Sequence, residues 1–412
     1  MTPVGHATFD FPRNAVSGAA MVDRSTRIRT LLGTGDDGWD LFYRARQMEA
    51  EGIAVANLTI GEHDTRTHPS ILEEMSRAAA RGHTGYAAVP GTDALRYAIA
   101  ARVTSRTQVA TARENVLVTP GGQAALFAAL MGTLDPGDEV LIPDPYYTTY
   151  PGTVRAAGGV PVFVPCRPEA GFAPEAAALN AAVTNRTRAI LINTPNNPTG
   201  AAYGADTLAD IFRVAEAHDL WVISDEVYDT QTWITRHRSF WAVPGARDRT
   251  LLIGSMSKSH AMTGSRIGWL LGPEAMVADL INLSTHTTYG VPGYIQDAAT
   301  YALSMGPTFE DTVALPFRRR RDACLARLDG HPVLRAQAPG GGMYLMLDIR
   351  KTGQSAPTFA SRLLTTHHIA VMPGDSFGHA AAGHVRVALT LPDAQLMPAF
   401  DQILSFAEEI AP

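Results

Sequence analysis

Short apolar segments alternate with helical segments between Val116 and Leu271, and this alternation constrains the fold more than any other feature of the chain. The expected strands are Val116–Thr119, Glu139–Ile142, Val160–Val164, Ala189–Asn193, Trp221–Asp225, Leu251–Gly254 and Ile267–Leu271. They lack the polar–apolar alternation of strands with one face in water, which favours burial on both faces. The pattern therefore predicts an α/β fold with a mostly parallel central sheet, whose ligand would lie at the carboxyl ends of the strands.

The chain changes character after about residue 300. Met343–Asp348 and His384–Leu389 alternate in the manner of half-buried strands, which indicates a small α+β domain. A chain of 412 residues suits two domains. We expect residues 1–60 to form an N-terminal arm and part of the small domain, 61–300 a large ligand-binding domain, and 301–412 the C-terminal small domain.

The charge distribution disfavours a nucleic-acid-binding protein. The net charge is −6 and the sequence pI is about 6.1, and no basic face is apparent. The run Arg318–Arg321 lies in a helix expected at Pro316–Leu328, and we interpret it as a solvated helix face.

Cysteine content and hydropathy indicate a cytoplasmic protein. Cys166 and Cys324 are far apart in sequence and match neither a disulfide framework nor a metal-binding spacing, so no metal site is expected. The first thirty residues lack the features of a signal peptide. No run approaches the ~20 apolar residues of a membrane span.

One strand exit combines residues that suit a phosphate and a reactive amine. The expected strand Leu251–Gly254 leads into Ser255-Met256-Ser257-Lys258, and Arg266 follows eight residues later. Hydroxyl groups and a guanidinium suit a phosphate. A lysine held partly out of water can lose its proton and form a Schiff base, so the segment points to pyridoxal phosphate. A strand exit with a solvated lysine would fit the same residues.

Further candidate residues follow other expected strands. Gly121, Gly122 and Gln123 stand where a helix N-terminus could bind an anion, although an ordinary strand-to-helix turn fits them too. Asp225 ends a strand, and the adjacent Glu226 is the competing carboxylate.

These motifs, in their order from Leu58 to Arg386, resemble class I/II pyridoxal-phosphate-dependent aminotransferases of fold type I, the aspartate aminotransferase superfamily. Asn193-Thr194-Pro195-Asn196-Asn197-Pro198-Thr199-Gly200, Gly85-Tyr86 and Gly383-His384-Val385-Arg386 carry the resemblance together with the lysine segment. The family fold is a large domain with a mostly parallel sheet and a small α+β domain.

The resemblance implies a role for each site residue. Lys258 would form the Schiff base and move the proton, with Asp225 facing the pyridine nitrogen and Tyr228 the phenolic oxygen. The other cofactor-binding residues would be Gly121, Gly122, Gln123, Tyr147, Ser255, Ser257 and Arg266, with Asn197 shared between cofactor and substrate. Gly61, Asn197 and Arg386 would bind the substrate. Tyr86 would reach the cofactor phosphate of a neighbouring subunit, which implies a homodimer with shared active sites.

Within the family, Ser257–Gly264, Tyr289–Ala299 and Gly341–Met343 resemble arginine–pyruvate transaminases. The expected reaction moves an amino group from an L-amino acid, with arginine as candidate, to a 2-oxo acid such as pyruvate. An arginine side chain needs an acidic partner, and the candidates are Asp36, Asp37, Asp40, Glu62 and Asp64. His63-Asp64-Thr65 departs from the usual Pro-Asp-Phe, and we expect His63 to be an exposed loop residue rather than a specificity residue.

Two other functions fit parts of the pattern. A pyridoxal-phosphate-dependent lyase or decarboxylase would share the fold and most site residues. A non-enzymatic regulator that binds pyridoxal phosphate would carry a DNA-binding module, but only about sixty residues precede Gly61 and none form a basic recognition helix.

Overall fold

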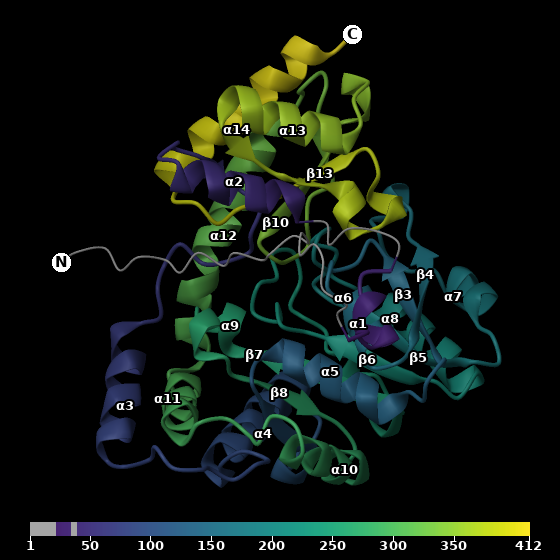
Figure 1. Ribbon diagram of the computed structural model, residues 1–412, viewed down its shortest axis with the longest axis vertical. Coiled ribbons are helices and arrows are strands. Elements are labelled where there is room, and N and C mark those ends of the chain that lie inside the picture. Colours follow the sequence, from purple (N-terminus) through teal and green to yellow (C-terminus); the bar gives the residue numbers. More distant parts are fainter. Residues whose placement is uncertain (1–21, 34–38) are drawn as a thin grey trace.

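The computed structural model describes residues 22–33 and 39–412, and a seven-stranded sheet forms its centre (Figure 1). The strands are β2 (Val116–Thr119), β3 (Glu139–Asp144), β4 (Val160–Pro165), β5 (Thr187–Asn193), β6 (Trp221–Asp225), β7 (Thr250–Ser255) and β8 (Gly268–Leu271). Their order is β2-β8-β7-β6-β5-β3-β4. Only β8 runs antiparallel to its neighbours, so the predicted mostly parallel sheet is confirmed.

Helices cover both faces of this sheet. They are α3 (Pro69–Ala80), α4 (Asp93–Thr107), α5 (Gly122–Thr133), α6 (Tyr150–Ala156), α7 (Ala176–Ala182), α8 (Ala205–Ala217), α10 (Glu274–Thr285) and α11 (Gly293–Ser304). Successive residues of β7 separate onto opposite faces: Leu251 and Ile253 pack in one core with α5, and Leu252 packs in another core with α4. This double burial explains the absence of polar–apolar alternation in the strand sequences.

The chain forms two smaller sheets as well, and Figure 1 shows β10 and β13 of one of them above the central sheet. One has the order β12-β13-β10-β9 and the other pairs β1 with β11. The strands are β1 (Ala56–Asn57), β9 (Arg335–Ala336), β10 (Tyr344–Asp348), β11 (Ile369–Ala370), β12 (Met372–Pro373) and β13 (His384–Ala388). The helices around them are α2 (Asp40–Ala50), α12 (Gly306–Leu328), α13 (Ala356–His367) and α14 (Asp393–Ile410).

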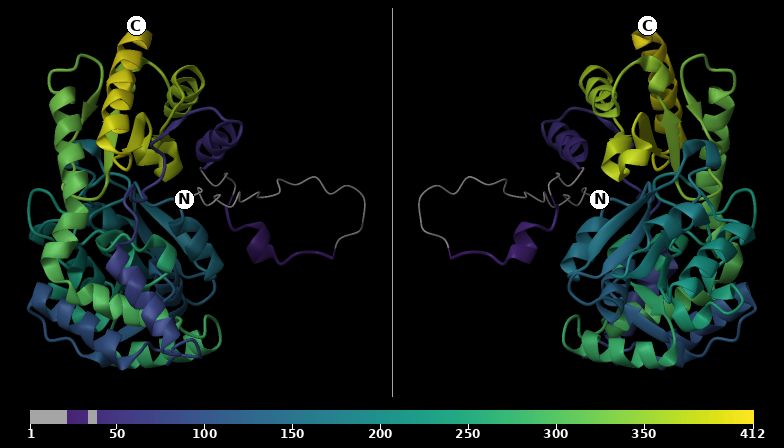
Figure 2. Two further views of the ribbon diagram at one scale, coloured as in Figure 1. Left: turned by 90° about the vertical axis from the view of Figure 1, so that its left-hand side faces the viewer. Right: turned by 90° about the vertical axis from the view of Figure 1, so that its right-hand side faces the viewer.

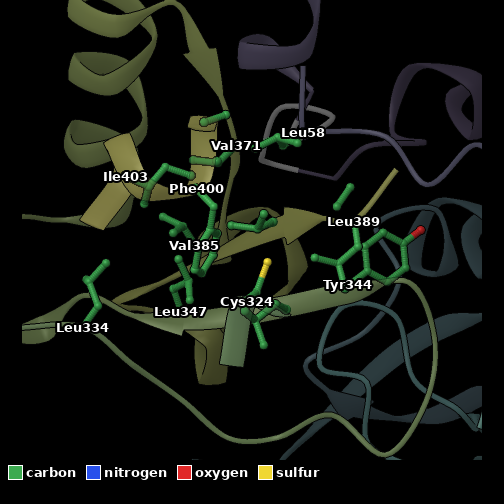
Figure 3. Close-up of a cluster of buried hydrophobic side chains, with 14 of the residues drawn as sticks. Leu58, Cys324, Leu334, Tyr344, Leu347, Val371, Val385, Leu389, Phe400 and Ile403 are labelled. Carbon is green, nitrogen blue, oxygen red and sulfur yellow. The ribbon is translucent and has the colours of Figure 1, made fainter. Parts of the chain in front are cut away.

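A separate apolar core holds this second part together. Leu347 and Val385 from facing strands pack with Phe400 and Ile403 of α14, and Cys324 of α12 closes the cluster (Figure 3). Both side views in Figure 2 show α2 and α14 on the same side of the central sheet. Residues 56–57 pair with residues 369–370, so a strand from the start of the chain joins one from its far end.

Two sequence-based expectations about local structure need correction. The helix expected at Pro316–Leu328 starts ten residues earlier, at Gly306, because α12 continues through Pro316. The run Arg318–Arg321 is not a uniformly solvated face, since the side chains of Arg320 and Arg321 are buried. Arg320 bonds to Asp393 and Asp64, and Arg321 donates to the Pro339 carbonyl, which compensates for their burial.

Two shorter elements complete the described fold. Helix α1 (Thr26–Arg29) precedes α2, and helix α9 (Met256–Ser259) follows β7 directly. Helix α9 places Lys258 at the carboxyl edge of the central sheet. Among residues 22–33 and 39–412, no helix is both long and apolar enough to cross a membrane.

Close packing of β7 against β8 predicts a stability effect at Gly254. A Cβ at this position would lie 2.2 Å from the Trp269 ring, so Gly254→Ala should destabilise the fold by about 1–3 kcal/mol in urea denaturation. Gly204→Ala is the matched control because no atom lies within 4 Å of its Cβ, and its effect should be at most about 1 kcal/mol. Equal effects of the two substitutions would contradict this packing.

Candidate active site

A cavity of about 330 Å³ lies at the carboxyl ends of β5, β6 and β7, between the central sheet and the second part of the chain. Twelve of the residues predicted from sequence line it: Gly61, Gly122, Gln123, Tyr147, Asn197, Asp225, Tyr228, Ser255, Ser257, Lys258, Arg266 and Arg386. These residues come from segments more than 300 positions apart. Their convergence agrees with the expectation that the ligand of a parallel sheet binds at the carboxyl ends of its strands.

Lys258 projects into the cavity from α9. Its ammonium group donates a hydrogen bond to the Gly61 carbonyl and lies 6.0 Å from the centre of the Tyr228 ring. Burial lowers the pKa of Lys258 to about 8, with the positive charges of Arg386 and Arg266 acting in the same direction and Glu62 opposing them. Roughly a tenth of this amine is therefore neutral at pH 7, far more than for an ordinary lysine, which suits a nucleophile or a base.

One end of the cavity is built to hold an anion. Gly121 caps the N-terminus of α5 at φ 83° and no side chain caps that helix. A Cβ at Gly121 would lie 2.5 Å from an Arg266 nitrogen, so the absence of a side chain lets the guanidinium approach the helix end. Ser255 and Ser257 line the same cavity with their hydroxyl groups 3.0 Å apart. Helix N–H groups, hydroxyls and a guanidinium together fit the phosphate of pyridoxal phosphate.

Asp225 also lines the cavity, at the end of β6. It accepts hydrogen bonds from the Tyr150 hydroxyl at 2.7 Å and from the Val227 amide at 3.2 Å. Burial raises the pKa of Asp225 to about 6, while these two donors oppose that rise. The carboxylate is charged near neutral pH and can pair with a protonated ring nitrogen, such as that of a pyridine.

The competing carboxylate, Glu226, points elsewhere. It accepts hydrogen bonds from Ser224 at 2.8 Å and from the Phe240 amide at 2.8 Å, and it pairs with His237. None of these groups lines the cavity. The structure therefore separates two carboxylates that the sequence left as alternatives, and only Asp225 faces the cavity.

Asn197 and Arg386 form a polar network above the lysine. Arg386 is 1% exposed and donates to the Asn197 side-chain oxygen at 2.8 Å, while its guanidinium lies 4.4 Å from the centres of the Tyr344 and Phe377 rings. The Tyr344 hydroxyl also contacts Tyr228 at 3.0 Å. The Nε atom of Arg386 is buried without a hydrogen-bond partner, which leaves a cationic donor free for an anionic ligand.

Two predicted residues stand outside the lining of the cavity. Gly121 adjoins it as the cap of α5. Tyr86 is 92% exposed and its ring packs edge-on against Tyr289 with centroids 5.1 Å apart. Tyr147 lies inside the cavity, perpendicular to Tyr150, and burial raises the pKa of Tyr147 to about 12.

Sequence patterns missed several residues of the cavity. Tyr150 and Tyr344 belong to no motif, and Asn193 stands in the Asn193–Gly200 motif without a role of its own, although Tyr150 donates to Asp225 and Asn193 accepts from the Asn197 backbone amide at 2.7 Å. Tyr344 stands in a strand that was recognised only by its alternation. Ile60, Leu126, Val227 and Thr263 complete the lining together with Trp39 and Glu62.

The prediction that His63 is an exposed loop residue is wrong. Its side chain is 5% exposed, and its ring packs edge-on against Phe317 of α12 with centroids 5.1 Å apart. The next residue, Asp64, pairs with Arg320 at 2.6 Å. Asp64 is therefore neutralised within the protein, and it does not line the cavity. Asp36 and Asp37 lie outside the described residues.

Comparison with known proteins agrees with this geometry. The family model "Aminotransferase class I and II" matches residues 53–403. The arginine–pyruvate transaminase of Pseudomonas aeruginosa is 42% identical over 380 residues, which cover 92% of this chain and 97% of the relative. The aspartate/prephenate aminotransferase of Thermus thermophilus is 36% identical over 364 residues, covering 87% of this chain and 92% of the relative.

Solved structures show the same architecture. Aspartate aminotransferase from Thermus thermophilus with maleate superposes with a TM-score of 0.88 at 34% identity, covering 94% of this chain and 100% of that chain. Fold, cavity and sequence similarity point to the same conclusion. The chain belongs to the class I and II aminotransferases.

Proposed function

We propose that the protein transfers the amino group of L-arginine to a 2-oxo acid such as pyruvate. The observation that carries the proposal is the cavity that the Lys258 amine shares with an anion-binding helix end and the buried Arg386 guanidinium. Such an arrangement suits a small zwitterionic substrate whose amino group must meet a carbonyl carbon. The 42% identity to a protein named arginine–pyruvate transaminase supports the choice of donor and acceptor.

Enzymes of this family depend on pyridoxal phosphate, whose aldehyde and electron-poor ring supply the carbonyl and the electron sink. We assign the phosphate to Gly121, Gly122, Gln123, Ser255, Ser257 and Arg266. Tyr147 would stack on the ring, and Asp225 would keep the ring nitrogen protonated. Tyr228 and Asn197 would donate to the phenolic oxygen.

Lys258 has two tasks in this proposal. It binds the cofactor aldehyde in the resting enzyme, and once released it moves a proton from the substrate Cα. Its lowered pKa, about 8, suits both tasks because the neutral amine is the reactive form. The Gly61 carbonyl accepts a hydrogen bond from the Lys258 amine and so fixes its direction.

Arg386 would bind the substrate α-carboxylate, with Asn197 and Gly61 beside it. Its guanidinium is already desolvated between two aromatic rings, so binding a carboxylate costs little further desolvation of the cation. The orphan Nε atom and the adjacent nitrogen offer the parallel donors that a carboxylate prefers.

Two further residues of the cavity lining suit a cationic side chain. Trp39 contributes an indole ring, which attracts cations, and Glu62 contributes a carboxylate. Glu62 accepts a hydrogen bond from Thr263 at 3.0 Å, which directs it along the cavity wall. Of the five acidic candidates, we therefore propose Glu62 as the partner of the substrate guanidinium.

We propose a homodimer with shared active sites. Tyr86 and Tyr289 form an exposed aromatic pair, and aromatic residues are enriched at protein interfaces. We retain the division into residues 1–60, 61–300 and 301–412, supported by the separate cores of the two parts.

A cytoplasmic location is supported by two buried cysteines without a disulfide bond.

The donor is tested by a half-reaction. The purified protein, loaded with pyridoxal phosphate, is mixed with each of a panel of L-amino acids without any 2-oxo acid. We expect arginine to convert the cofactor stoichiometrically to its amine form, with release of the matching 2-oxo acid. Catalytic release of ammonia, CO₂ or a thiol would instead identify a lyase or decarboxylase, and conversion by aspartate but not by arginine would refute the proposed donor.

Loss of the Tyr150 hydroxyl should shift the pH dependence of cofactor binding. Tyr150→Phe removes a donor that holds down the Asp225 pKa, so that pKa should rise above its present value of about 6. Cofactor affinity falls at low pH as Asp225 is protonated, and in the variant this fall should begin about one pH unit higher. Tyr203→Phe is the control, because Tyr203 is buried but does not line the cavity. An unchanged onset of this fall in Tyr150→Phe would contradict the role of Asp225.

Shared active sites predict complementation between two inactive variants. Tyr86→Ala and Lys258→Ala each leave every site defective in a pure dimer. In a hybrid dimer, one site receives both intact residues if Tyr86 acts across the interface. Mixing equal amounts should restore about a quarter of the wild-type activity. No recovery despite hybrid formation, shown by native mass spectrometry, would place Tyr86 outside the partner's site.

A further inference from the structure

Tyr344 brings a hydroxyl group from the second part of the chain into the cavity. It belongs to β10, its side chain is 2% exposed, and Figure 3 shows its hydroxyl turned away from the apolar side chains around it. The hydroxyl oxygen lies 3.0 Å from that of Tyr228 and 3.4 Å from the Asn197 side-chain nitrogen. Tyr344 therefore reaches the two residues to which the phenolic oxygen of the cofactor is assigned.

Close packing holds this hydroxyl in place. A Cβ on Gly61 would lie 1.7 Å from the Tyr344 oxygen, so the hydroxyl fits there only because Gly61 has no side chain. The Arg386 guanidinium lies 4.4 Å from the centre of the Tyr344 ring. The ring is thus fixed from two directions, with its hydroxyl beside Tyr228.

The hydrogen bonds around Tyr344 determine where its proton can go. Arg386 donates to the Asn197 side-chain oxygen at 2.8 Å, which leaves the Asn197 nitrogen to face Tyr344. An amide nitrogen can only donate, so the Tyr344 oxygen is the acceptor in that contact. The Tyr344 proton is then available for the Tyr228 oxygen.

Tyr228 can accept that proton when its own is directed at the cofactor. Burial raises the pKa of Tyr228 well above its usual value, so Tyr228 is a neutral hydroxyl with a single proton to donate. In the function proposed above, this proton points to the phenolic oxygen, and the Tyr228 oxygen is left as an acceptor. Successive hydrogen bonds polarise one another, so a bond from Tyr344 would strengthen the bond that Tyr228 makes.

We propose that Tyr344 is a positioning residue, whose hydroxyl donates to the Tyr228 oxygen and so strengthens the hydrogen bond from Tyr228 to the phenolic oxygen of bound pyridoxal phosphate. The proposal rests on the proposed function, in which Tyr228 makes that bond. Because Tyr344 belongs to β10, the second part of the chain then influences the protonation of a cofactor whose other assigned contacts come from the central sheet and its helices.

The test is a pH titration of the visible absorption of the full-length protein with bound pyridoxal phosphate and without substrate. Its midpoint reports the proton on the Lys258 nitrogen that is joined to the cofactor, which is shared with the phenolic oxygen. A donor to the phenolic oxygen weakens this sharing and lowers the midpoint, so loss of the donor should raise it. The other ionisable groups that face Tyr228 are Tyr147 and Arg386, and both are retained in every variant.

Two single variants and their combination separate the direct effect from the indirect one. Tyr228→Phe should raise the midpoint by about one to two pH units, because it removes the donor itself. Tyr344→Phe keeps the ring beside Arg386 and should raise the midpoint by about half a unit to one unit. The double variant should match Tyr228→Phe within about 0.3 unit, since Tyr344 acts only through Tyr228.

Two further proteins complete the set. Replacement of Tyr344 by 3-fluorotyrosine strengthens the hydroxyl as a donor, because fluorine withdraws electrons, and should move the midpoint in the opposite direction to Tyr344→Phe. Tyr203→Phe is the matched control, because it also removes a buried phenol hydroxyl but lies outside the cavity lining. Its midpoint should stay within about 0.3 unit of the wild-type value. Thermal unfolding shows whether each variant is folded.

Three results would overturn the proposal. One is a folded Tyr344→Phe protein with the wild-type midpoint, and another is a shift of the same sign for Tyr344→Phe and the fluorotyrosine protein. The third is a double variant shifted well beyond Tyr228→Phe, which would mean that Tyr344 acts through Asn197 or Arg386 instead. A wild-type protein that forms no visible band with pyridoxal phosphate would refute the proposed function, and this proposal with it, whereas the three results above leave the proposed function intact.

Discussion

The hydrogen bond from the Lys258 ammonium to the Gly61 carbonyl joins the two parts of the structure at the point where the chemistry takes place. Lys258 follows β7 of the central sheet, whereas Gly61 belongs to the segment Thr59–Asp64, which also bonds to Arg386, Thr390 and Arg320 of the second part. The direction of the amine therefore depends on contacts from both parts.

Buried charge is the main energetic cost of this site, and each charge is compensated in a different way. Arg386 is placed between two aromatic rings and bonds to Asn197. Asp225 accepts two hydrogen bonds. Lys258 loses its charge in part of the molecules, because its pKa falls to about 8. A buried charge with an incomplete set of partners is available to a ligand, which is what a binding site requires. The orphan Nε of Arg386 is the clearest case.

The sequence predicted the sheet and most of the cavity because both depend on local patterns. Strand burial appears as continuous apolar runs, and parallel strands bring their carboxyl ends to one edge regardless of what separates them in sequence. The choice between Asp225 and Glu226 was also open to local reasoning. Side chains alternate along a strand, so Ser224 and Glu226 share one side, where they bond to each other, and Asp225 takes the other.

The remaining features depend on contacts that no local pattern encodes. His63 is buried because Phe317, some 250 positions later, covers it. Arg320 and Arg321 are buried while Arg318 and Arg319 are exposed, since α12 turns only part of its circumference toward Asp64 and α14. Tyr150 reaches Asp225 across 75 positions and carries no motif of its own.

The most direct test of the central claim asks which amine binds the cofactor. The protein is loaded with pyridoxal phosphate, treated with borohydride, which converts a carbon–nitrogen double bond into a stable single bond, and digested for mass spectrometry. The structure predicts one adduct per chain on the peptide that contains Lys258. An adduct on Lys351, the only other lysine, or no adduct at all, would show that this cavity does not bind the cofactor in the way described.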